Sequence, residues 1–135
     1  MSSSPQNSAP AIQISIAPWL TVADATTAVA FYKNAFHAVE TYRLEIPGGG
    51  LVAKLAIGQA EFWVSSAEDA ATVQGPVGGS TVRMILTVNN PDELFASATS
   101  AGAKEIFPVG ESHGWRLGRI EDPFGLHWEI GHPLL

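Results

Sequence analysis

The chain has 135 residues, 46% of them hydrophobic, and a formal net charge of −6 at pH 7. This length is typical of one folded domain, and the negative charge argues against nucleic acid as a partner, because nucleic-acid binding requires a basic surface. The chain contains no cysteine, which excludes disulfides, thiolate nucleophiles and cysteine-ligated metal sites and fits the cytoplasmic location that we expect.

The N-terminal residues 1–11 are rich in Ser and Pro and are predicted to form a disordered lead. They lack the basic and apolar regions of a secretory signal. No apolar run reaches the length of a membrane-spanning helix, so we expect no membrane partner. Residues 12–135 are therefore expected to form a single domain.

The first half of that domain is predicted to contain a strand, a helix and three further strands. Apolar and polar residues alternate over 12–22, which predicts a half-buried strand with Pro18 at an edge or a bulge. Asp24 stands where an N-cap belongs, ahead of a predicted helix over 25–36. Glycine-rich turns separate the later strands, and a connector over 67–80 ends the half. These strands are predicted at about 38–46, 51–57 and 60–65.

The second half repeats the same order of elements. Alternation predicts a strand over 82–88, followed by a helix over 91–101 with Asn89 or Asn90 as cap and Gly102 as its C-terminal stop. The turn 122–125, Asp-Pro-Phe-Gly, precedes the last strand. The three strands after the helix are predicted at about 104–109, 115–121 and 126–131.

The two halves align at a single offset of 66 residues. Leu20-Thr21-Val22 recurs as Leu86-Thr87-Val88, and Phe62-Trp63-Val64 falls on Trp128-Glu129-Ile130. One register therefore matches the first and the last strand of each half. The chain is predicted to be a β-α-β-β-β module used twice, over 12–66 and 81–132.

These segments resemble the vicinal-oxygen-chelate superfamily, which includes glyoxalase I, bleomycin resistance proteins and dioxygenases, and most closely its PhnB-like branch. The resemblance implies an α+β fold in which two β-α-β-β-β modules form a curled mixed sheet around a cup, with helices outside. The residues that carry it are Pro18-Trp19-Leu20-Thr21-Val22, Ala30-Phe31-Tyr32-Lys33-Asn34-Ala35-Phe36, Ala101-Gly102-Ala103 and Asp122-Pro123-Phe124-Gly125-Leu126-His127-Trp128.

Alternation along the strands assigns side chains to two faces. One face, which includes Val82, Met84 and Trp128, is predicted to pack beneath the helices, and the other to line the cup. Aromatic side chains in a cup stack on planar ligands and attract cations, and glutamates would add an acidic wall. Our candidate ligand-binding residues are Trp19, Glu61, Trp63, Arg83, Trp115, His127 and Glu129.

Metal-dependent relatives take one ligand from the first and one from the last strand of each module. The matching positions are Ala17, Trp63, Arg83 and Glu129. Only Glu129 can bind a cation, so we expect no metal cofactor. Two alternatives concern the same strand: a divalent metal displaced to His127 and Glu129, with Glu61 as a third ligand, or a plain ion pair between Glu129 and Arg83.

Three functions remain open. The first is a metal-free binding protein that holds a small planar or cationic molecule in an aromatic and acidic cup. The second is a metal-dependent lyase, isomerase or dioxygenase with an atypical site around His127 and Glu129. The third is an interaction domain whose cup is filled. Whether the chain is an enzyme is not decided by its residues, and the resemblance implies a homodimer.

Overall fold

The computed structural model describes residues 15–66 and 82–134. The predicted lead over 1–11 and connector over 67–80 lie outside these residues. The first module contains β1 (Trp19–Val22), α1 (Ala25–Phe36), β2 (Val39–Glu45), β3 (Leu51–Ile57) and β4 (Ala60–Ser66). The second contains β5 (Met84–Thr87), α2 (Pro91–Ser100), β6 (Lys104–Ser112), β7 (Trp115–Glu121) and β8 (His127–Pro133).

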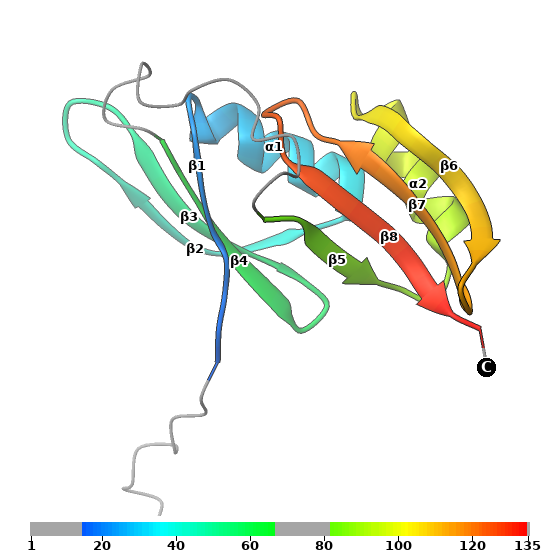
Figure 1. Ribbon diagram of the computed structural model, residues 1–135. Coiled ribbons are helices and arrows are strands. Elements are labelled where there is room, and N and C mark those ends of the chain that lie inside the picture. The colour runs from blue at the N-terminus through cyan, green and yellow to red at the C-terminus, as the bar shows by residue number, and fades with distance from the viewer. Residues whose placement is uncertain (1–14, 67–81, 135) are drawn as a thin grey trace, which may run out of the picture.

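The strands form two four-stranded mixed sheets of identical topology (Figure 1). Sheet A has the order β1-β4-β3-β2 and sheet B the order β5-β8-β7-β6. In each sheet the first and last strands of the module pair in parallel, and the other pairs are antiparallel. The repeated β-α-β-β-β module and the α+β class are confirmed, and the described strands do not close into a barrel.

Helix α1 begins and ends as its sequence predicts. Asp24 accepts hydrogen bonds from the backbone amides of Thr26 and Thr27 at 3.0 and 3.3 Å, which satisfies donors that the first turn leaves free. The helix ends at His37, whose φ of 60° is left-handed. Asn90 caps α2 in the same way, through the amide of Glu93 at 3.2 Å, so the cap is Asn90 and not Asn89.

The first strand of each module is shorter than predicted. Of the strand expected over 12–22, residues 12–14 lie outside the described part of the chain, residues 15–18 are not paired as a strand, and β1 begins at Trp19. Pro18 has no N–H to donate, although its carbonyl accepts a hydrogen bond from the amide of Trp63 at 2.8 Å. The strand expected over 82–88 begins only at Met84. Val82 was predicted to pack beneath a helix but is exposed, since it precedes the paired residues of β5.

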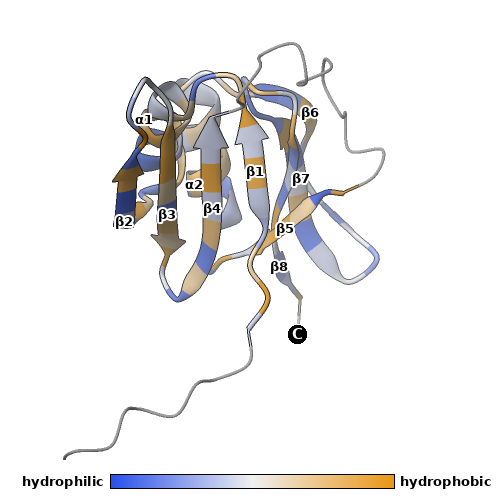
Figure 2. Ribbon diagram, turned by 90° about the vertical axis from the view of Figure 1, so that its left-hand side faces the viewer, coloured by the Kyte–Doolittle hydropathy of each residue, from blue (hydrophilic) through white to orange (hydrophobic). Residues whose placement is uncertain are grey.

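Helix α1 covers one face of sheet A, α2 covers one face of sheet B, and the two helices pack against each other. Tyr32 of α1 contacts Phe62 of sheet A and Trp128 of sheet B, with ring centroids 5.3 and 5.5 Å apart. The helix-covered faces of the two sheets therefore turn toward each other, and the helix-free faces point outward. Figure 2 looks onto the free face of sheet A, with both helices behind it.

The turn 122–125 ties the two modules together. Asp122 is only 3% exposed, and its carboxylate accepts hydrogen bonds from the amides of Phe124 and Leu126, both at 2.9 Å. It also accepts from the Tyr32 hydroxyl at 2.6 Å and from the Trp128 indole at 2.9 Å. Burial raises the pKa of Asp122, although these four hydrogen bonds oppose the rise. Burial, and then the charge of Asp122, raises the pKa of Tyr32 well above its usual value, which keeps its hydroxyl protonated as a donor.

Within the described residues, no helix has the length and hydrophobicity needed to cross a membrane.

Candidate functional site

One side chain from each strand of sheet A forms a continuous row across its free face. The register places Trp19 of β1 opposite Trp63 of β4, Trp63 opposite Lys54 of β3, and Lys54 opposite Tyr42 of β2. We call these four residues the aromatic row. It brings together two of the candidate residues, Trp19 and Trp63, with two that the sequence analysis did not select.

The aromatic row is held in place by its own contacts. The Trp19 and Trp63 rings stack with centroids 5.7 Å apart, and Tyr42 meets Trp63 edge-on at 5.8 Å. The Trp19 indole donates a hydrogen bond to the Ser65 hydroxyl at 2.9 Å, which fixes the plane of its ring. Trp19 and Tyr42 are 53% and 47% exposed. The row therefore presents an ordered aromatic surface, and its side chains need not rearrange before a ligand binds.

The Lys54 ammonium crosses the middle of this row. Its nitrogen lies 5.1 Å from the centroid of the Trp63 ring and 3.2 Å from a carboxylate oxygen of Glu61. The candidate residue Glu61 is thus close to the row but is already paired with a cation.

Sheet B carries an equivalent row of different chemistry. Ile85 of β5 lies opposite Glu129 of β8, Glu129 opposite Arg119 of β7, and Arg119 opposite Phe107 of β6. We call these four residues the charged row. Its members follow those of the aromatic row by 65 or 66 residues, so the two rows are repeats of one feature.

Two arginines share one carboxylate oxygen in the charged row. The Oε2 atom of Glu129 lies 3.2 Å from Nε of Arg83 and 3.3 Å from Nη2 of Arg119. The Arg119 guanidinium also lies over the Phe107 ring, 5.2 Å from its centroid. The ion pair between Arg83 and Glu129 is confirmed. Since both Glu61 and Glu129 are paired with cations, the predicted acidic wall is wrong.

His127 lies on the same strand face as Glu129, but it is only 8% exposed. Its Nε2 atom is 4.0 Å from an oxygen of Glu121, and its buried Nδ1 atom has no hydrogen-bond partner in the described part of the chain. Over residues 15–66 and 82–134, no three His, Asp or Glu side chains are grouped so that they could hold a metal ion. The three ligands of the displaced metal site are thus not assembled there, and metal-free function stays a prediction.

The last candidate, Trp115, lies at the start of β7. It pairs in register with Ser112 and Pro133, four residues along the strand from Arg119. The structure therefore does not bring Trp115 into either row.

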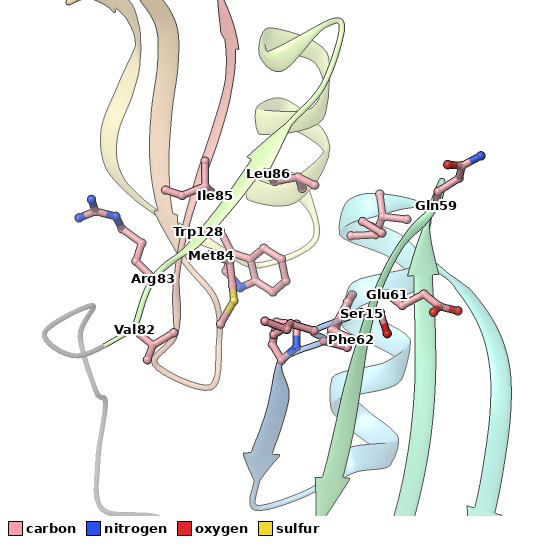
Figure 3. Close-up of a pocket in the computed structure, with 15 residues that line it drawn as sticks. Ser15, Gln59, Glu61, Phe62, Val82, Arg83, Met84, Ile85, Leu86 and Trp128 are labelled. Carbon is pink, nitrogen blue, oxygen red and sulfur yellow. The ribbon is translucent and has the colours of Figure 1, made fainter. Parts of the chain in front are cut away.

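A cavity of about 500 Å³ opens between β5 on one side and, on the other, the segment 15–18 that precedes β1 together with the start of β4 (Figure 3). Its walls are mainly apolar, with Met84 and Trp128 on the side of sheet B and Phe62 on the side of sheet A. Glu61 and Arg83 also line it, although the Arg83 guanidinium turns away from its centre. Its volume is in the range of small-molecule sites.

The candidate residues did not include Ile85 or the four row residues of the remaining strands: Lys54, Tyr42, Arg119 and Phe107. The signal that could have found them is the repeat itself, at an offset of 65 residues instead of 66. Each row pairs a cation with an aromatic ring, and that pairing recurs in both modules.

Comparison with known proteins identifies related chains. A family model described as a glyoxalase-like domain matches residues 17–130. An uncharacterized protein of Mycobacterium bovis, Mb0911c, is 36% identical over 131 residues, which cover 91% of this chain and 86% of that protein.

Two solved structures are similar in fold. TioX from Micromonospora sp. ML1 is 25% identical, with a TM-score of 0.72 over 90% of this chain and 100% of that one. The fosfomycin resistance protein FosX from Listeria monocytogenes is 16% identical, with a TM-score of 0.71 over 93% of this chain and 97% of that one. At 16% identity the likeness shows the shared fold alone.

Proposed function

The chain belongs to the glyoxalase-like domain family. We propose that it binds a small planar molecule on the aromatic row, without a metal ion. The observation that carries the proposal is the row itself: Trp19, Trp63 and Tyr42 in mutual contact on a helix-free sheet face, with the indole of Trp19 held by Ser65. Ordered aromatic surface that remains exposed favours stacking of a flat guest.

The charge of the bound molecule is inferred from the ion pairs near the two rows. A cationic guest was favoured by two glutamates that turn out to be paired, Glu61 with Lys54 and Glu129 with two arginines. A neutral or anionic planar guest is therefore supported better than a cation. Placement in the PhnB-like branch and location in the cytoplasm stay predictions.

Tryptophan fluorescence tests the aromatic row directly. We expect planar aromatic compounds to quench the emission of the wild type and to bind the Trp63→Leu variant about fivefold more weakly, since one stacked ring contributes about 1 kcal/mol. Trp115→Leu is the matched control, because it removes a tryptophan outside both rows and should leave binding unchanged. The proposal would be refuted if no compound in a broad panel of planar cations, anions and neutral molecules quenched the tryptophan emission of the wild type.

The metal-free part of the proposal has its own test. Protein purified without a histidine tag should contain no stoichiometric Zn²⁺, Mn²⁺, Ni²⁺ or Fe²⁺, and addition of these ions should not raise its thermal stability. A ligand that binds only the folded state must raise it, so a shift with one of these ions would favour the metal-dependent alternative.

We also propose that the protein works as a homodimer. The two rows point away from each other within one chain, so a guest that contacts both would need a second copy. Trp19, Val39, Tyr42 and Leu44 are exposed apolar side chains on the free face of sheet A, and exposed apolar surface of this kind favours association. Sedimentation should give twice the chain mass, and Leu44→Glu, which leaves the aromatic row intact, should shift it toward one. A monomer at all concentrations would contradict this proposal and leave the row's own test unaffected.

A further inference from the structure

We infer that Arg83 and Arg119, the arginine pair, form a binding site for a carboxylate group. The inference is argued from the contacts of sheet B, and it rests on the proposed function in one respect. Because the two rows point away from each other within one chain, a guest with its carboxylate on the arginine pair and its ring on an aromatic row would bridge two copies of the proposed homodimer.

The first argument is the balance of charge around Glu129. Two guanidiniums approach its Oε2 atom at 3.2 and 3.3 Å, and no other carboxylate of the described residues lies within ion-pair distance of either. Glu121 contacts His127 instead. The Arg119 side chain is only 20% exposed, so its charge is poorly solvated. A mostly buried guanidinium that shares its counter-ion is stabilised by a second anion.

The second argument is a pair of buried polar atoms that lack partners. Nε of Arg119 and Nδ1 of His127 are the two such side-chain atoms in the described part of the chain, and both residues lie on the free face of sheet B. Arginine nitrogens can only donate hydrogen bonds, and more than nine in ten buried polar groups are normally satisfied. Because Nε itself is closed to solvent, a guest carboxylate would meet the part of the Arg119 side chain that stays exposed, about 20% of it, and would offset the charge that the unpaired Nε leaves poorly compensated.

The third argument concerns shape. A guanidinium presents a planar fork of donors that matches the two oxygens of a carboxylate, and the contact with Phe107 restrains the plane of Arg119. Ile85 and Phe107, at the two ends of the charged row, are both exposed and apolar. A carboxylate attached to a flat apolar body therefore suits the charged row better than a small inorganic anion does.

The test compares naphthalene-2-carboxylate with naphthalene-2-carboxamide, which has nearly the same shape and no charge. Tryptophan fluorescence reports binding to the aromatic row, and the Nε–H signals of Arg83 and Arg119 in nitrogen–proton spectra report the arginine pair. We expect the carboxylate to bind about tenfold more tightly, the ratio for a hydrogen bond to a charged group. We also expect the Arg119 signal to move only with the carboxylate.

Substitutions then test whether the two arginines cause the preference for the carboxylate over the carboxamide. Arg83→Gln and Arg119→Gln should each reduce the tenfold preference to less than threefold while binding of the carboxamide persists. Arg43→Gln is the matched control, because Arg43 pairs with Glu40 and Glu45 on sheet A and should not affect the preference. Urea midpoints check folding, and Arg83, the more exposed of the pair, keeps the test valid if Arg119→Gln does not fold.

Other outcomes separate the two proposals. Equal binding of both compounds with unmoved arginine signals would overturn the carboxylate site and leave the aromatic row standing. Arginine signals that move with the carboxylate while tryptophan emission stays constant would support the site and count against the row. An Arg119 signal that follows protein concentration and ignores the compounds would assign the position to a carboxylate of a second copy, and would overturn the inference.

Discussion

Replacing Asp122 by alanine should destabilise the fold more than removal of any single one of its hydrogen bonds. The carboxylate joins Tyr32 in the helix of the first module to Trp128 in the last strand of the second. It also holds the amides of Phe124 and Leu126 in the turn. One side chain therefore maintains both the turn and the contact between modules.

The expected loss of folding stability in Asp122→Ala depends on whether each donor to the carboxylate is buried or can reach water. Without the carboxylate, the Tyr32 hydroxyl and the Trp128 indole lose their partner in the core, at about 1–3 kcal/mol for each unsatisfied donor. The two turn amides belong to a surface loop and can bond to water. Asp122→Ala should thus cost about 2–6 kcal/mol, a large part of the 5–15 kcal/mol typical of a domain. Tyr32→Phe leaves three donors on the carboxylate and should cost about 1–2 kcal/mol.

Urea denaturation followed by far-ultraviolet circular dichroism measures both losses. Asp92→Ala is the control, because it removes an exposed carboxylate that pairs with Arg116 at the surface and should change stability little. A cost of less than 1 kcal/mol for Asp122→Ala, or equal costs for Asp122→Ala and Tyr32→Phe, would refute the reasoning.

Three further predictions concern the same fold. Burial raises the pKa of Asp122 above its value in the unfolded chain, so protonation of Asp122 stabilises the folded state. This stabilisation is fully present below the pKa of the unfolded state and is lost as pH rises through the pKa of the folded state. The free energy of unfolding in urea should therefore rise for the wild type relative to Asp122→Asn as pH falls from 7 to 3. A difference that stays constant over this range would contradict the prediction. Gly118→Ala should cost about 1–3 kcal/mol in thermal unfolding, because its Cβ would lie 2.8 Å from the Phe95 ring of α2; an unchanged melting temperature would show that the ring can move. Asn90→Ala should cost about 1 kcal/mol through loss of the α2 cap, and Asn90→Asp, which can still cap, should not.

The binding chemistry could be predicted only in part. Trp19 and Trp63 were selected because alternation places both on one face, and the structure stacks them. The acidic wall was wrong for a physical reason: whether Glu129 is paired with a cation depends on other strands, and Arg119 reaches it only through the antiparallel pairing of β7 with β8. Short-range patterns show which way a side chain points but not which charge it meets across a sheet.

The sequence by itself determined the repeated module, the positions of the helices, the Asp24 cap, and the alternation of faces within the paired strands. These depend on local physics: side-chain period, capping hydrogen bonds and turn residues act over a few positions. Only the tertiary structure decided that both helices pack between the sheets, so that the two rows face outward, and that Asp122 accepts from both modules. These features depend on pairs of residues far apart in the chain, Tyr32 and Asp122 or Lys54 and Trp63, whose meeting is set by sheet register and by burial of the shared core.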